Sequence, residues 1–114
     1  MNELKRIVTG LVPTLISTAI IVSARGQEVS IPDPGLNAAV RETLQKPVGP
    51  LTKQDMLGLT SLNAGNRNIT NAAGLDAARN LVGLLLYSNH LTDFSLPGGL
   101  THLAFLDLTG NQLT

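Results

Sequence analysis

The sequence predicts an α/β solenoid, in which short coils stack side by side, place a parallel β-sheet on the concave face, and follow two short helices. Two observations lead to this fold class. A twelve-residue pattern recurs every 22 residues over the second half of the 114-residue chain, and helix start signals occur in the segment before the first copy. A fixed period of this length is typical of repeat architectures, because a single coil cannot bury its own apolar face without neighbours.

The repeat is clearest in two copies. The segments LVGLLLYSNHLT at 81–92 and LAFLDLTGNQLT at 103–114 share six of twelve residues, where ordinary residue usage would give on the order of one. The shared pairs are Leu81/Leu103, Leu84/Leu106, Leu86/Leu108, Asn89/Asn111, Leu91/Leu113 and Thr92/Thr114. A looser copy at 59–70 departs from the pattern, with Ala64 in place of leucine and Arg67 in place of asparagine.

The first 26 residues have the layout of a secretory signal peptide. A short basic head at Lys5 and Arg6 precedes a mostly apolar run over 7–22, and small residues follow it. Cleavage is expected after Ala24 or Gly26. An uncleaved membrane anchor is the alternative, although the run is shorter than the roughly 20 residues that a spanning helix needs. We therefore expect a secreted or cell-envelope protein.

The first helix is predicted to begin after Asp33. Asp33 is a suitable N-cap, and Pro34 would occupy the first helical position, where its missing N–H group has no intrahelical partner to lose. Leu36, Val40 and Leu44 follow at intervals of four residues and form one apolar stripe.

A second short helix is predicted directly after a tight connection. Pro47, Gly49 and Pro50 end the first helix. Thr52 can cap the second helix, and Asp55 lies three residues later, at the second position of a capping box.

Each repeat is predicted to contribute one short strand. Leu84 and Leu86 alternate with outward residues, as in a strand with one buried face. The predicted strands are 62–64, 84–86 and 106–108, and adjacent coils place them in parallel, roughly 4.8 Å apart.

Asparagine follows the turn after each of the last two strands. The side-chain amides of Asn89 and Asn111 can bond backbone groups that a turn leaves unpaired, so that a structural Asn ladder along the stack satisfies buried polar groups. Arg67 puts this ladder in doubt in the first coil.

The pattern L-x-x-L-x-L-x-x-N-x-L with its 22-residue period resembles bacterial leucine-rich repeat proteins of the internalin-like kind, and the segment IPDPGLNAAVRETLQKPVGPLTKQDMLGLTSL at 31–62 resembles their helical N-terminal cap. The resemblance covers roughly residues 31–114. It implies a right-handed superhelix with a capped N-terminal end. It also divides the chain into a signal peptide (1–26), a helical cap (27–58) and leucine-rich repeats (59–114, as coils 59–80, 81–102 and the incomplete 103–114).

The concave face is the expected binding surface of such a solenoid. Its outward positions are Ser61, Asn63, Gly65, Gly83, Leu85, Tyr87, Phe105, Asp107 and Thr109. The candidates for contact with a partner are Leu85, Tyr87, Phe105, Asp107 and Thr109, because outward apolar and aromatic residues on a rigid scaffold make good anchors. The partner is a protein or a surface glycan; the alternative is that these are incidental surface residues.

The composition excludes several kinds of function. The chain has no cysteine and a formal net charge of zero, which gives no thiol-based metal site and no electrostatic footprint for nucleic acid. His90 and His102 lie 12 residues apart, and Asp93 and Asp107 lie 14 apart, so neither pair is in phase with the repeat. We expect no catalytic residues, no metal and no cofactor, and a protein that is not an enzyme.

The sequence also leads us to expect a fragment of a longer protein. It stops at Thr114, directly after the last Asn turn, and strand 106–108 would be an open edge that favours self-association. The alternative is that the chain is the N-terminal cap and stalk of a larger exported protein, whose activity as an adhesin or an enzyme lies further downstream.

Overall fold

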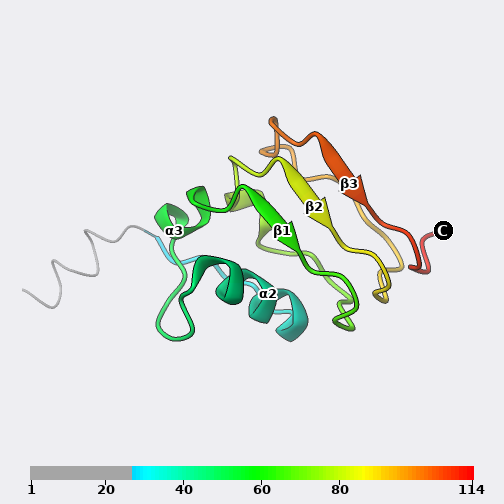
Figure 1. The fold of residues 1–114 in the computed structure, drawn as a ribbon, viewed down its shortest axis with the longest axis horizontal. Coiled ribbons are helices and arrows are strands. Elements are labelled where there is room, and N and C mark those ends of the chain that lie inside the picture. The colour runs from blue at the N-terminus through cyan, green and yellow to red at the C-terminus, as the bar shows by residue number, and fades with distance from the viewer. Residues whose placement is uncertain (1–26) are drawn as a thin grey trace, which may run out of the picture.

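The computed structural model describes residues 27–114, and the predicted signal peptide lies outside the described residues. The elements are the helices α2 (Pro34–Leu44) and α3 (Lys53–Leu57), the strands β1 (Ser61–Asn63), β2 (Gly83–Leu85) and β3 (Phe105–Asp107), and the 3-10 helix η1 (Leu75–Ala77). The two helices lie beside β1, and the strands follow one another across the sheet (Figure 1). None of the helices over 27–114 is both long and apolar enough to cross a membrane.

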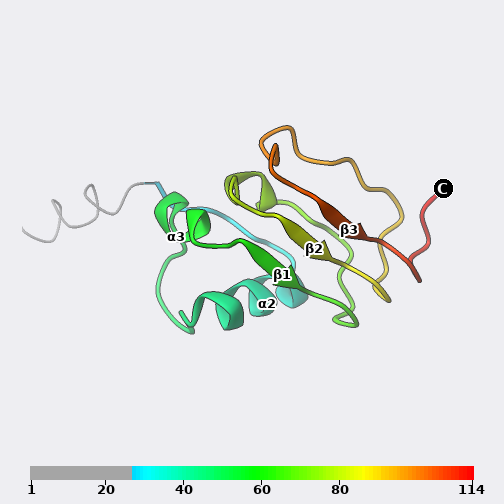
Figure 2. The same ribbon diagram turned by 45° about the horizontal axis from the view of Figure 1, so that its top comes forward.

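The three strands form one parallel sheet in the order β1-β2-β3. Leu62, Leu84 and Leu106 are register partners, so a step of one coil is a step of 22 residues. This confirms the predicted parallel strands, although each begins and ends one residue earlier than predicted. The pairing itself continues further, because the Ala64 N–H donates to the Leu85 carbonyl at 2.8 Å. Figure 2 shows the strands side by side, with the return segments behind them.

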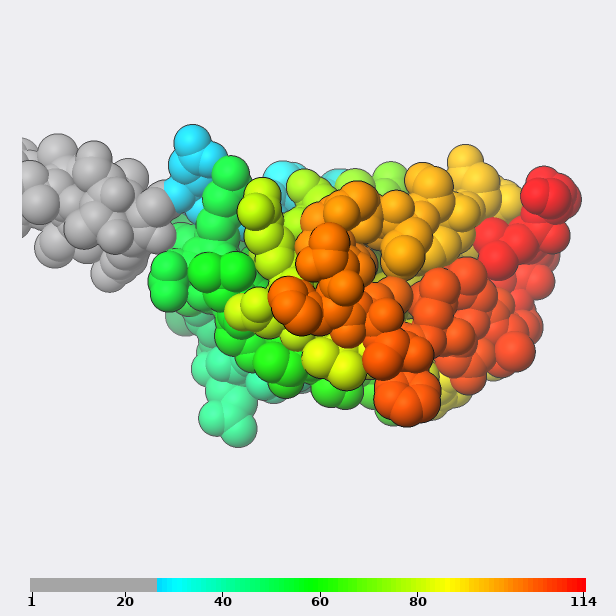
Figure 3. All heavy atoms as spheres, turned by 90° about the horizontal axis from the view of Figure 1, so that it is seen from above, coloured from blue at the N-terminus to red at the C-terminus, as the bar shows by residue number. Residues whose placement is uncertain are grey.

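The core runs between the sheet and the return segments. Leu62, Leu84 and Leu86 are fully buried, and Ala78 and Leu100 of the return segments join them. The layers follow one another along the molecule, from the green N-terminal part to orange and red (Figure 3). Each coil therefore relies on its neighbours for burial, as expected of a repeat architecture.

The last strand is covered on one side only. β3 pairs with β2, and no other strand within residues 27–114 lies along its second edge. Leu106 is 42% exposed, although its register partner Leu84 is fully buried. The same residue type in the same phase thus differs in burial because one neighbouring layer is missing.

Helix α2 begins and ends as its sequence predicts. The Asp33 carboxylate accepts a hydrogen bond from the Leu36 N–H at 3.0 Å, and Pro34 occupies the first turn. Val40 is fully buried together with Leu36, whereas Leu44 is half-buried.

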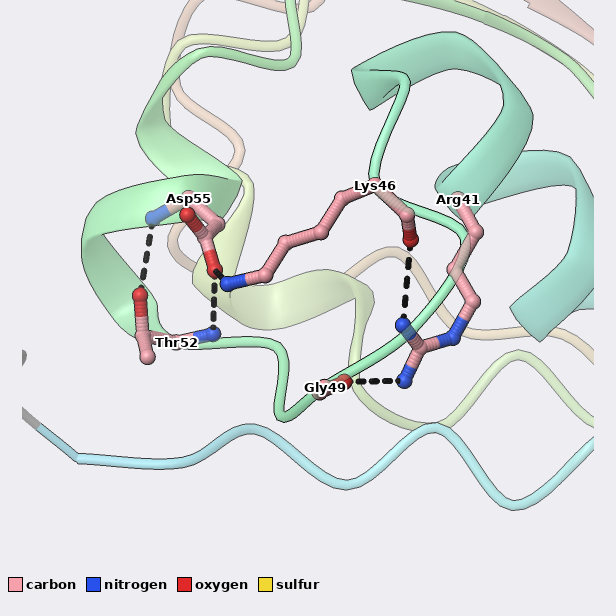
Figure 4. A network of polar contacts seen from close by, with 5 residues as sticks. All are labelled: Arg41, Lys46, Gly49, Thr52 and Asp55. Atoms are coloured by element: carbon pink, nitrogen blue, oxygen red, sulfur yellow. Dashed lines mark hydrogen bonds and ion pairs between the residues drawn. The ribbon is translucent and has the colours of Figure 1, made fainter.

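Helix α3 and the loop before it are held by polar contacts (Figure 4). Thr52 and Asp55 form a reciprocal capping box. Asp55 also accepts a hydrogen bond from Lys46 Nζ at 2.6 Å, while Arg41 donates to the carbonyls of Lys46 and Gly49 at 3.1 and 2.8 Å. Two cations thereby fix the connection between the helices.

Coil 1 departs from the repeat pattern where it meets α2. Arg67, which replaces the asparagine, forms an ion pair with Glu42 of α2. A side chain at Gly35 would collide with the Arg67 carbonyl, so the first turn of α2 lies directly against the turn of coil 1. Asp33 completes the junction by accepting a hydrogen bond from the Thr70 N–H at 2.9 Å.

Acidification is expected to weaken this junction through Asp33. Burial raises the pKa of Asp33, but hydrogen bonds from the N–H groups of Thr70 and Leu36, the Thr70 hydroxyl and the Gly35 N–H outweigh it, so the pKa lies below its ordinary value of 3.8. A carboxylate with a depressed pKa contributes stability above its unfolded pKa and loses that contribution as pH falls through its folded pKa. The free energy of unfolding should therefore fall from about pH 5 towards about pH 2.

The variant Asp33→Asn isolates this contribution. It should lower the free energy of unfolding by about 1–3 kcal/mol at neutral pH, because the cap and the Thr70 contact both weaken. It should then lose less on acidification than the parent protein. Urea midpoints at neutral and acid pH measure both effects, with Asp76→Asn, at an exposed position, as the matched control. An acid loss as large in Asp33→Asn as in the parent would contradict the prediction.

Candidate functional site

The candidate site is the sheet face that points away from the core. We call it the open sheet face and define it by the nine outward residues of the three coils: Ser61, Asn63, Gly65, Gly83, Leu85, Tyr87, Phe105, Asp107 and Thr109. Side chains alternate along a strand, so the burial of Leu62, Leu84 and Leu86 turns the residues between them outward. The position of the face thus follows from the repeat alone.

The register brings apolar and acidic side chains together on this face. Leu85 lies opposite Asp107, and Gly83 lies opposite Phe105. Phe105 is 69% exposed, whereas Leu85 and Tyr87 are half-buried. An aromatic ring of this exposure next to a leucine is an apolar contact point held by a hydrogen-bonded sheet.

Tyr87 lies flat on coil 1. A Cβ atom built on Gly65 would collide with three carbons of the Tyr87 ring, Cζ, Cε1 and Cε2, at nearly equal distances. Near-equal distances mean that the face of the ring, not its edge, covers Gly65. The opposite ring face then points away from the sheet. The sequence analysis missed this contact, although the 22-residue spacing of Gly65 and Tyr87 was a visible signal.

Adding a methyl group at Gly65 is expected to displace this ring. The Gly65→Ala side chain would need the space that the Tyr87 ring occupies. Tyr87 is the one tyrosine of a chain without tryptophan, so intrinsic fluorescence reports on it alone. The variant should shift tyrosine emission intensity and acrylamide quenching towards a solvent-exposed ring, with a loss of about 1–3 kcal/mol in stability from overpacking. Gly98→Ala, where a Cβ would meet no atom within 4 Å, should leave both unchanged; equal quenching in all three proteins would contradict the stacked ring.

Two short polar turns support the face. Asp107 Oδ1 accepts hydrogen bonds from the N–H and the hydroxyl of Thr109, at 3.0 and 2.7 Å. Asn63 Oδ1 accepts one from the Gly65 N–H at 3.1 Å. The bonds from Thr109 hold the pKa of Asp107 below its usual value. Asp107 alone among the nine residues carries a charge, so the open sheet face is weakly acidic.

Asparagine side chains fix the turns that follow the strands. Asn89 is 1% exposed, and its Oδ1 accepts hydrogen bonds from the N–H groups of Arg67 and Ile69. Asn111, in the same phase, accepts one from the Leu91 N–H at 3.0 Å and donates to the Leu86 carbonyl at 2.9 Å. Each asparagine thus joins its own coil to the preceding one, which keeps the face rigid.

The histidines lie away from this face. His90 Nε2 is 3.1 Å from Asn68 Oδ1, and His102 Nδ1 is 3.2 Å from the Arg79 carbonyl. Each ring therefore contacts the preceding coil. Over residues 27–114, no three histidine or acidic side chains gather in a group that could hold a metal ion.

Asp93 lies in a hollow on the return segments. The hollow has a volume of about 470 Å³ and lies between coils 1 and 2. Its lining includes Asp76 and Phe94, together with Pro97. Asp93 and Asp107 are thus on different surfaces, and the structure does not bring them together as a carboxylate pair.

The fold is similar to that of two solved internalins from Listeria monocytogenes. InlF matches with a TM-score of 0.69 and 28% identity, over 74% of this chain and 25% of its own. InlC2 matches with a TM-score of 0.66 and 35% identity, over 70% of this chain and 36% of its own. The chain therefore spans about a quarter and about a third of the lengths of these two proteins.

A third similar structure comes from Clostridium perfringens. It contains CBM51-2 in complex with GlcNAc and INT domains of ZmpB, and it matches with a TM-score of 0.63 and 29% identity over 72% of this chain and 17% of its own. No protein-family model matches the chain, and no curated protein sequence does so either.

Proposed function

From the premise that this is an internalin-like leucine-rich repeat chain, we propose that it is a recognition module that binds a protein partner through the open sheet face. One observation carries the proposal: Phe105 is 69% exposed beside Leu85 on a sheet whose turns are fixed by asparagine. Exposed aromatic anchors on a rigid surface are the usual centres of protein interfaces. The module performs no chemistry of its own in this proposal.

The proposal includes export and an N-terminal cap. Residues 1–26 act as a signal peptide, and the mature protein begins near Arg25 or Gln27 in the medium or the cell envelope. Residues 27–58 cover the end of the stack, which is supported by the contact of α2 with β1 and of α3 with η1. Residues 59–114 form the first coils of a right-handed superhelix. N-terminal sequencing of the exported protein tests the first point, and an intact Met1 there would favour a membrane anchor.

Site-specific photocrosslinking tests the binding face. A benzoylphenylalanine replaces Phe105 in one protein and Leu96, a 49% exposed residue of a return segment, in the control. Each protein is irradiated with an extract of the surface proteins and glycans that the exported chain would meet. Crosslinked products should be several-fold more abundant through position 105 than through position 96. Equal yields would contradict recognition through the open sheet face.

The same experiment separates a protein partner from a glycan. A glycan remains the second candidate because one matched structure contains a CBM51-2 domain in complex with GlcNAc. Protease treatment of the extract should abolish the crosslinks if the partner is a protein. Periodate oxidation should abolish them if the partner is a glycan.

An alternative function is that of N-terminal cap and stalk in a larger exported protein, with an adhesin or enzyme domain elsewhere. The observation in its favour is that this chain covers only 17% of the matched ZmpB chain. The gene sequence beyond codon 114 distinguishes the two functions. Further 22-residue copies would favour the recognition module, and a different domain would favour the stalk.

A further inference from the structure

Gly83 lies in the central strand of the sheet, where the fold does not require a glycine. Its backbone is not among those with positive φ. A Cβ atom there would meet only the Ser61 Oγ, at 3.6 Å, which is an ordinary van der Waals contact. Gly65 and Gly35 are different, because a Cβ on either would collide with a neighbour.

A glycine of this kind weakens a strand. It loses more backbone entropy on folding than other residues and offers no side chain to pack. A glycine inside a strand marks a bulge, a bend or a place where a ligand or another backbone comes close. Gly83 pairs in regular register with Ser61 and Phe105, so a bulge does not explain it.

The missing side chain leaves a notch on the open sheet face. Ser61 of β1 and Phe105 of β3 lie on its two sides, as register partners of Gly83. Leu85, the next outward residue of β2, lies at its end. The backbone of the floor is already bonded, since the Gly83 N–H donates to the Thr60 carbonyl and the Val82 carbonyl accepts from the Phe105 N–H.

The chemistry of the notch selects its occupant. Its walls carry no charge and offer one hydroxyl, that of Ser61, and Asp107 lies opposite Leu85 rather than Gly83. A charged group placed there would lose water without gaining a counter-ion, and a sugar ring would leave most of its hydroxyls without partners. An uncharged aliphatic side chain matches these walls in charge and polarity.

We propose that Gly83 is a specificity-determining position, at which an aliphatic side chain of a protein partner lies against the sheet between Ser61 and Phe105. This inference rests on the proposed recognition function. It assigns to the glycine the role of leaving space, so filling that space removes binding without harming the fold.

The first test is stability. Gly83→Ala and Gly83→Val should keep or raise the melting temperature, by up to about 5 °C, because any residue with a side chain favours a strand more than glycine does. Gly98→Ala is the matched control, at a glycine whose Cβ would meet no atom within 4 Å. A clear fall in the melting temperature of Gly83→Ala would show that the fold itself needs this glycine, and would overturn the proposal.

The second test uses small probes. N-acetyl-leucine methylamide is titrated into the full chain and followed by the NMR amide signals of Gly83 and Leu85. Saturable shifts are expected, with an affinity on the order of millimolar for so small a ligand. They should vanish in Gly83→Val and persist in Gly98→Ala. Absence of shifts at Gly83, or shifts with N-acetylglucosamine in place of the leucine probe, would overturn the assignment.

Crosslinking through position 105 separates this inference from the proposed function. Gly83→Val should reduce the crosslinks by about tenfold, the effect of roughly one lost anchor, whereas Gly98→Ala should not. Undiminished crosslinks in Gly83→Val would leave recognition through the face intact and refute the notch. Failure of crosslinking in the parent protein would remove both.

Discussion

Replacement of Asn89 by alanine is expected to bring the protein close to unfolding. Asn89 is 1% exposed and bonds backbone groups of two coils. Its amide accepts from the N–H groups of Arg67 and Ile69 and donates to the carbonyls of Ala64, Leu86 and Tyr87. Truncation leaves these buried groups without partners, at about 1–3 kcal/mol for each unsatisfied group. A total of about 4–6 kcal/mol is a large share of the roughly 5–10 kcal/mol that holds a domain of this size.

Asn111 and Asn68 supply matched controls. Asn111 occupies the same phase but is half-buried, and its Oδ1 accepts a hydrogen bond from the Leu91 N–H. Water can replace part of its bonding, so Asn111→Ala should cost about 1–2 kcal/mol. Asn68 is exposed, and Asn68→Ala should cost little. Urea unfolding followed by far-UV circular dichroism measures all three, and equal losses for Asn89→Ala and Asn111→Ala would refute the role assigned to burial.

Replacement of Leu86 by alanine is the second large effect. Leu86 is fully buried within the stack, and its neighbour Leu85 is half-buried on the open sheet face. Leu86→Ala should lower the free energy of unfolding by about 2–5 kcal/mol, through lost transfer energy and a residual cavity. Leu85→Ala should cost less than about 1.5 kcal/mol, because much of its surface is already in water.

The position of a leucine in the stack should matter as much as its phase. Leu84 and Leu106 are register partners, but Leu84 is fully buried and Leu106 is 42% exposed. Leu84→Ala should therefore resemble Leu86→Ala, and Leu106→Ala should resemble Leu85→Ala. Midpoints of urea unfolding at constant m-value give the comparison. Similar losses for Leu85→Ala and Leu86→Ala would mean that the inward and outward sides of the strand are assigned wrongly.

Some of the site could be predicted from the sequence. The alternation of leucines places Leu85, Tyr87 and Phe105 on the outward side without any structure, because successive side chains of a strand point to opposite faces. Their part in binding stays a prediction. Their surroundings could not be predicted: the ring of Tyr87 lies on Gly65, while Gly83 remains uncovered. Side-chain directions across strands depend on the room that each neighbour leaves, which the period does not contain.

The sequence by itself determined the repeat, the parallel strands and the helix caps. Those features follow from local chemistry: a leucine every second residue, Asp33 before Pro34, and Thr52 three residues before Asp55. Such signals act within a few residues of the chain and can be found without knowing what packs against them.

Only the tertiary structure decided why coil 1 breaks the pattern. Arg67, an apparent defect in the Asn ladder, joins its coil to Glu42 of α2, and Asp33 reaches Thr70, 37 residues away. A repeat predicts contacts between copies of itself, whereas this junction joins a coil to a helix that is not a repeat. The residues at that boundary answer to the shape and charge of α2, which no periodicity in the coils specifies.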